Sequence, residues 1–164
     1  MAGEKAAVLF SGGVDSSFAA VTIAPEFRKV VLLTYLVPGM TSVDNSRRNA
    51  ATLAKMFPGS VSHEIHDLRG FVNEVRGGII DCVKNNYKYG FFYSWCLGCK
   101  LSMHLHTIEY CLRNDIQDVF DGNNIYDRHA LEQHEEVIER LRSLYEKEGM
   151  RYSSPFYRHD HIEL

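Results

Sequence analysis

The sequence lacks any hydrophobic run long enough to cross a membrane. A spanning helix needs about 20 consecutive apolar residues, and no stretch of the 164 residues approaches that length. The first ten residues, MAGEKAAVLF, turn too soon into a strand pattern to serve as a signal peptide. We therefore expect a cytoplasmic protein without a membrane partner.

Basic residues and cysteines are both scarce. Eighteen Lys and Arg stand against 21 Asp and Glu, a net charge of −3, so the chain has no general electrostatic footprint for nucleic acid. If RNA is a substrate, a local patch, another domain or a partner must hold it. Four cysteines, two of them in a CxxC, do not indicate a disulfide framework. They fit metal or redox use in a reducing compartment.

Short apolar stretches alternate with segments of helical periodicity. The strand patterns cover residues 7–10, 29–36, 61–68, 118–120 and 153–157. The helical patterns cover residues 16–24, 46–57, 71–85, 97–112 and a last segment around 137–145. This alternation predicts one α/β domain over residues 1–164, with a doubly wound, mostly parallel five-stranded sheet and helices on both faces. Ligands of such sheets bind beyond the carboxyl ends of the strands.

The most informative segment is AVLFSGGVDSS, residues 7–17. An apolar strand runs directly into a turn of small residues, behind which a helix begins. Two adjacent glycines allow backbone conformations that are closed to other residues. Successive N–H groups and the positive helix terminus can then face one anion, and the serines add hydroxyl donors. The segment predicts a site for a phosphate chain; the structural alternative is a Gly-Gly turn capped by Asp15 or a serine.

Within this segment SGGVDS resembles the SGGxDS PP-loop of the N-type ATP pyrophosphatases, with every fixed position present. It is not a Walker A loop, because GxxxxGK[ST] does not occur. The resemblance implies that ATP is cut between its α and β phosphates and that AMP activates a substrate. It implies that Thr34 and Tyr35 meet the adenine. The residues expected to hold the phosphates are Ser11, Gly12, Gly13, Val14, Asp15, Ser16 and Ser17.

A second polar segment, DGNNIYD, follows the fourth predicted strand. Gly122 and Asn123, with Asp127 behind them, resemble the place where family members help to hold ATP and its magnesium. Hard oxygen ligands near a phosphate suit Mg²⁺, so we expect Asp15 and Asp127 to bind the ion. The alternative is an ordinary turn, because Asp, Gly and Asn are common turn residues.

Cys96 and Cys99 form the CxxC and open the helix predicted over residues 97–112. A thiol at a helix N-terminus with a lysine beside it should have a lowered pKa. That chemistry suits a persulfide carrier, a redox pair, or two ligands of a zinc ion or an iron–sulfur cluster.

A single CxxC supplies only two of the four ligands that zinc or a cluster needs. Cys111 lies about 18 Å along the helix from Cys99 and on its apolar stripe, so we expect it in the core, together with His104. Cys82 is the better third ligand, but a buried apolar role is the stronger reading of that residue.

The chain is thus expected to be an ATP pyrophosphatase or adenylating transferase or ligase. Asp15, Cys96 and Cys99 are its candidate catalytic residues, and sulfur transfer to a tRNA or a small molecule its expected chemistry. The segment SPFYRHDHIEL resembles the family's approach to a further helix that this chain does not reach, so we expect a homo-oligomer or a partner protein. Two alternatives stay open: an ATP- or AMP-binding regulatory module without turnover, and a metal or redox protein built on the CxxC.

Overall fold

The computed structural model describes residues 3–39, 43–85, 91–127 and 129–157, with only the backbone given for residues 78–85 and 91–94. Five strands form one sheet in the order β3-β2-β1-β4-β5, and every neighbouring pair is parallel. The strands are β1 (Gly3–Leu9), β2 (Phe27–Leu36), β3 (Val61–Asp67), β4 (Asp118–Phe120) and β5 (Arg151–Ser153). The predicted α/β fold with a parallel five-stranded sheet is confirmed.

The centre of the sheet is buried on both faces. Side chains alternate along a strand, so the continuous apolar run of β2 supplies two cores at once. Val31, Leu33 and Tyr35 join one core cluster, whereas Val30 and Leu32 join the other. A run of branched apolar residues without alternation is typical of a strand covered on both sides.

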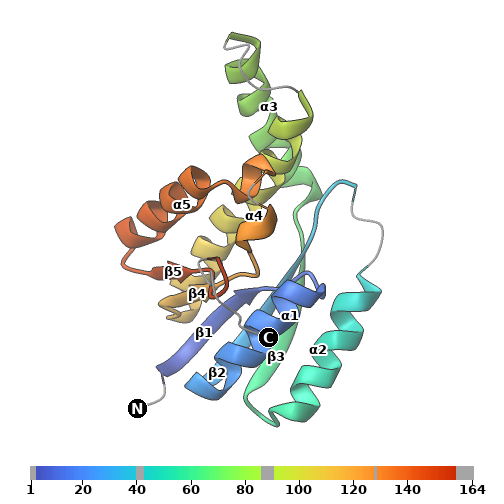
Figure 1. The fold of residues 1–164 in the computed structure, drawn as a ribbon, viewed down its shortest axis with the longest axis vertical. Coiled ribbons are helices and arrows are strands. Elements are labelled where there is room, and N and C mark those ends of the chain that lie inside the picture. Colours follow the sequence, from blue (N-terminus) through green and yellow to red (C-terminus); the bar gives the residue numbers. More distant parts are fainter. Residues whose placement is uncertain (1–2, 40–42, 86–90, 128, 158–164) are drawn as a thin grey trace.

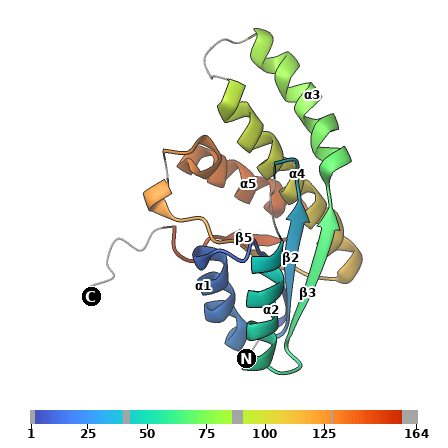
Figure 2. The same cartoon turned by 90° about the vertical axis from the view of Figure 1, so that its right-hand side faces the viewer.

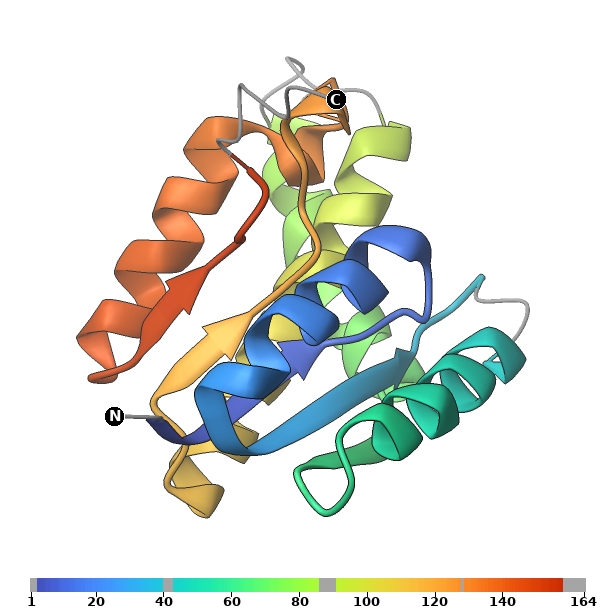
Figure 3. The same ribbon diagram turned by 60° about the horizontal axis from the view of Figure 1, so that its bottom comes forward.

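Helices cover both faces of the sheet (Figures 1 and 3). One face packs against α1 (Val14–Ile23) and α2 (Asp44–Met56). The other packs against α3 (Arg69–Asn85), α4 (Phe91–Asn114) and α5 (Glu135–Lys147). The upper parts of α3 and α4 extend beyond the carboxyl ends of the strands (Figure 2). No helix in the described part of the chain combines the length and apolar character that a membrane crossing requires.

Several element boundaries differ from the sequence prediction by a few residues, and two of these differences have a clear physical reason. The helix expected from Leu97 begins at Phe91. No glycine or proline, the residues that most disfavour a helix interior, lies between these two positions, and Gly90 directly precedes Phe91. The last strand lies at Arg151–Ser153 rather than 153–157. Its register pairs Arg151 with Asp118, and Pro155, which has no N–H to donate, cannot prolong the ladder.

Two glycines hold the turn between β1 and α1 against its neighbours. Gly12 has φ +77°, and a Cβ there would lie 2.4 Å from the Cα of Ser46 in α2. Its carbonyl also accepts a 2.7 Å hydrogen bond from Asn49. On the other side, a Cβ on Gly122, after β4, would lie 2.5 Å from the backbone nitrogen of Ser16. The turn is therefore fixed by backbone contacts that no larger residue permits.

Replacing Gly122 with alanine should destabilise the protein by about 1–3 kcal/mol, because the added methyl group meets backbone that cannot rotate away. Urea unfolding measures the free energy. Gly70→Ala is the matched control: nothing lies within 4 Å of its added Cβ, and an alanine there should leave stability unchanged or raise it slightly. Equal stabilities for the two variants would contradict the close approach at Gly122.

Candidate functional site

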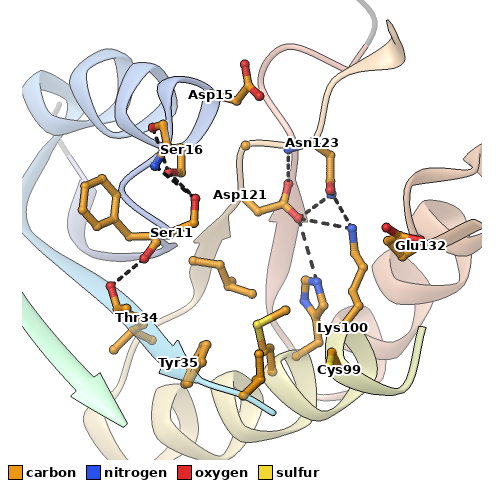
Figure 4. A pocket seen from close by; sticks show the side chains of 18 of the residues that line it. Ser11, Asp15, Ser16, Thr34, Tyr35, Cys99, Lys100, Asp121, Asn123 and Glu132 are labelled. Carbon is orange, nitrogen blue, oxygen red and sulfur yellow. Dashed lines mark hydrogen bonds and ion pairs between the residues drawn. The ribbon is translucent and has the colours of Figure 1, made fainter. Parts of the chain in front are cut away.

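A cavity of about 560 Å³ opens beyond the carboxyl ends of β1, β2 and β4 (Figure 4). It lies between β1 and β4, where the chain changes direction across the sheet, the usual ligand position in an open parallel sheet. The predicted site residues on its wall are Ser11, Gly13, Asp15, Ser16, Thr34, Tyr35, Cys96, Cys99, Gly122 and Asn123. The structure thus brings the glycine-rich turn, the DGNN segment and the CxxC to one cavity.

The N-terminus of α1 faces this cavity without a side-chain cap. Its N-cap residue is Gly13, which has no side chain to cap the first turn. The Ser11 hydroxyl accepts from the Gly13 N–H at 3.2 Å and lies 3.0 Å from the Ser16 hydroxyl. Uncapped N–H groups at the positive end of a helix favour an anion.

Three residues of the turn do not line the cavity: Gly12, Val14 and Ser17. Gly12 packs against α2, as described above, and the Val14 side chain is exposed. The Ser17 hydroxyl is buried and has no hydrogen-bond partner among the described residues. Contacts of these residues with a phosphate stay predictions.

The two carboxylates expected to hold magnesium share one hydrogen-bond donor. The Asn124 amide donates to Asp15 at 3.2 Å and to Asp127 at 3.0 Å. Both carboxylates are exposed, and oxygen ligands of this kind beside an anion site fit Mg²⁺. No cluster of three or more His, Cys, Asp or Glu suited to a metal occurs among the described residues, so phosphate oxygens or water would complete the coordination. Asn124 itself was missed, although it lies in the DGNN segment.

Thr34 and Tyr35, expected to meet adenine, line the cavity with their hydroxyl groups already engaged. Thr34 donates to the Phe10 carbonyl at 2.5 Å and contacts His63 at 2.8 Å. The Tyr35 hydroxyl lies 2.7 Å from that of Thr107, and burial raises its pKa. Contacts with a base would therefore use the backbone or apolar atoms of these residues, and they stay predictions.

A buried polar network forms the wall opposite the glycine-rich turn (Figure 4). Its centre is Asp121, which accepts hydrogen bonds from Tyr152 at 2.6 Å and Ser154 at 2.5 Å. The side chain of Asn123 also donates to Asp121 and accepts from Lys100 at 2.6 Å. The backbone N–H of Asn123 also donates to Asp121, at 3.1 Å, so any contact of Asn123 with a nucleotide would come from its backbone carbonyl.

Lys100 and His104 were missed as members of this network, although they are four residues apart on one helix. Lys100 lies 3.9 Å from Asp121, and His104 lies 3.8 Å from it. Burial lowers the pKa of Lys100. Burial, with a smaller effect of Lys100, lowers the pKa of His104 to about 3. His104 is therefore neutral at pH 7, and Lys100 is the cation that faces Asp121.

The cysteines do not lie at a helix N-terminus, because α4 begins at Phe91. Burial, Glu132 and the neighbouring Cys99 raise the pKa of Cys96, so the expectation of a lowered pKa is wrong for that thiol. Cys99 accepts a 2.8 Å hydrogen bond from Arg76 of α3, a residue that the sequence did not indicate. Cys111 is fully buried in the core, as predicted, and so is His104.

The described residues supply two thiols to the cavity, Cys96 and Cys99. A structural zinc ion or a [4Fe–4S] cluster takes four ligands, and no third cysteine or histidine joins this pair in the part of the chain that the structure describes. The side chain of Cys82 lies outside the described residues. As described, the pair does not complete a metal site.

No family model matches the sequence, and no curated protein matches it. Two solved structures share its fold. One is a predicted subunit of tRNA methyltransferase from Methanocaldococcus jannaschii, with TM-score 0.51 and 19% identity, over 94% of this chain and 69% of the other. The second is the U34-tRNA thiolase NcsA from Methanococcus maripaludis with its [4Fe-4S] cluster, with TM-score 0.60 and 11% identity.

The second match covers 95% of this chain and 53% of the thiolase, so the chain spans about half of that protein. At such identities the likeness shows a common fold alone. That fold agrees with the PP-loop resemblance of the glycine-rich turn. The [4Fe-4S] cluster is that of the thiolase. The two cysteines that line the cavity of this chain supply only two of the four ligands that such a cluster takes.

Protonation of His104 should destabilise the protein in acid. Its folded pKa of about 3 lies below the ordinary 6.5, so between these values only the unfolded state binds the proton, and stability falls as the pH drops. The loss approaches about 1.4 kcal/mol per pH unit. His104→Gln should remove this part of the pH dependence in urea unfolding, whereas the exposed control His129→Gln should keep it. Parallel pH profiles for wild type and His104→Gln would contradict the neutral, buried imidazole.

Proposed function

We propose that the chain binds ATP at the glycine-rich turn and cleaves it between the α and β phosphates, so that AMP activates an acceptor. One observation carries the proposal: the uncapped α1 terminus and two thiols line the same cavity. An anion site alone would fit any phosphate ligand. An anion site with sulfur nucleophiles across the cavity fits the activation of a carbon–oxygen bond followed by displacement.

The N–H groups of the first turn of α1, with the hydroxyls of Ser11 and Ser16, would bind the β and γ phosphates. Asp15 and Asp127 would hold Mg²⁺, which neutralises the charge of the phosphates when bound. The adenine would lie against the ends of β1 and β2, beside Thr34. On the opposite wall Lys100 faces the carboxylate of Asp121, so its positive charge is already paired.

Sulfur is the acceptor chemistry that we propose, because Cys96 and Cys99 are the soft nucleophiles on the cavity wall. One of them would carry or relay sulfur to the adenylated position. A tRNA acceptor is supported by the two proteins of the same fold, both of which carry tRNA in their names. Because the net charge is −3, a local basic patch, another domain or a partner protein would have to supply the RNA contact. Free thiols at this position fit a reducing compartment such as the cytoplasm.

The products of ATP turnover test the reaction class. With Mg²⁺ and candidate tRNA or small-molecule acceptors, the expected products are AMP and pyrophosphate, separated by anion-exchange chromatography. Release of ADP and phosphate would overturn the proposed cleavage. Tight ATP binding by calorimetry with no AMP on any acceptor would favour the regulatory module over the enzyme.

A Gly13→Ala variant should bind ATP more weakly and keep its fold. Its added Cβ meets only the Ser11 hydroxyl at 3.3 Å, and the backbone has an ordinary φ of −74°, so folding tolerates the change. Against a bound phosphate the same methyl group would lie in the anion site and weaken affinity by about tenfold or more, roughly 1.4 kcal/mol. Calorimetry gives the affinity, circular dichroism checks the fold, and Gly70→Ala is the control. Unchanged affinity in Gly13→Ala would place the phosphates elsewhere.

A further inference from the structure

Arg76 is a buried arginine without a carboxylate partner among the described residues. Only 4% of it is exposed. Its Nη2 donates to the Cys99 sulfur at 2.8 Å, and its Cζ lies 3.3 Å from the centre of the Trp95 ring. Its Nε and Nη1 atoms are buried and have no hydrogen-bond partner there. A guanidinium stays charged at every pH at which a protein is folded, so a full positive charge faces Cys99.

A buried charge is costly unless an opposite charge or several hydrogen bonds compensate it. The face of Trp95 supplies a cation–π contact, worth about 0.5–2 kcal/mol. The remaining contact is the sulfur of Cys99. A neutral thiol is a weak acceptor, whereas a sulfur anion is both a strong acceptor and a counter-charge. The buried positive charge of Arg76 is therefore compensated best when the sulfur of Cys99 carries a negative charge.

The second thiol of the pair has different surroundings. Cys96 is the more exposed of the two, and the negative charge of Glu132 acts on it, together with burial, to disfavour its anion. Both cysteines line the cavity that the glycine-rich turn borders. Arg76 thus contacts Cys99 directly, whereas its effect on Cys96 is smaller than the opposing effect of Glu132.

We infer that Cys99 is the reactive sulfur of the CxxC pair and that Arg76 is the positioning residue that orients it and stabilises its negative charge when it reacts. The ligands of this site are soft electrophiles that enter the cavity. The natural electrophile would be the outer sulfur of a persulfide donor. Only this choice of electrophile rests on the proposed function. There the Cys99 sulfur attacks the outer sulfur, a new S–S bond forms, the S–S bond of the donor breaks, and the donor leaves as its thiolate.

Alkylation of the reduced protein tests the site without ATP or a sulfur donor. Each sulfur anion displaces iodide from iodoacetamide and becomes a thioether. A short pulse at pH 7 is followed by digestion, and tandem mass spectrometry locates the label at Cys96 or Cys99. Exposure alone favours Cys96. We expect Cys99 to react faster by about tenfold, because thiolate rather than thiol is the nucleophile. Faster labelling of Cys96 in the wild type would overturn the assignment.

Three variants separate charge from packing. Arg76→Met removes the charge at similar volume and should lower the Cys99 rate by about tenfold. The Cys96 rate should fall less, because Arg76 has only a small effect on the pKa of Cys96. Arg76→Lys keeps the charge and should restore much of the Cys99 rate. Arg69→Met is the control on the same helix, since Arg69 pairs with Asp67 on the surface, and both rates should stay at wild-type values. Equal loss at both cysteines, or no loss at Cys99, would contradict a role for Arg76.

Arg76→Met is judged only where circular dichroism shows a folded protein. If it does not fold, the wild-type ratio of the two labelling rates and the Arg76→Lys variant decide the question. Failure of the ATP reaction would leave these rates untouched. If Cys96 and Cys99 are labelled at equal rates in a protein that forms AMP, the roles inferred for Arg76 and Cys99 are wrong, whereas the proposed ATP site is unaffected.

Discussion

The turn after β1 is held by backbone that touches backbone on two sides, and the site depends on this constraint. Gly12 meets the start of α2, and Gly122 meets the first turn of α1. A β-carbon at either position would push these segments apart. The contact at Gly122 also joins the two halves of the sheet where their direction changes, so it holds the α1 terminus beside the segment that follows β4. The α1 terminus keeps its place at the cavity because these three segments cannot separate.

The opposite wall of the cavity is held by polar bonds instead. Asp121 accepts from Tyr152 and Ser154 of the last strand and the residues after it, and it lies near Lys100 of α4. Buried polar groups of this kind are stable only when their hydrogen bonds are satisfied. The network therefore fixes α4 against the ends of β4 and β5. It also keeps polar groups at the edge of an otherwise apolar cavity floor.

The sequence predicted what depends on local patterns. The apolar run of β2, the glycine-rich turn and the core position of Cys111 follow from periodicity and residue type. The helix start at Phe91 was missed because Ser, Thr, Asp or Asn, the residues that most often cap a helix N-terminus, do not directly precede it. The partnerships of Lys100 with Asn123 and of Arg76 with Cys99 each join residues 23 positions apart. Such pairs depend on how α3 and α4 pack and on how α4 meets β4, which no spacing within one segment reveals.

One helix carries both the thiols that line the cavity and a large part of the core. The C-terminal half of α4 buries Cys111 and bonds through Thr107 to Tyr35 of β2, while its earlier turns carry Cys96 and Cys99 to the cavity. A change of core volume beneath Thr107 would therefore move the sulfur atoms relative to the glycine-rich turn. The distance across the cavity is thus set in part by the hydrophobic core, and a substitution far from the cavity can change it while the residues that line the cavity stay the same.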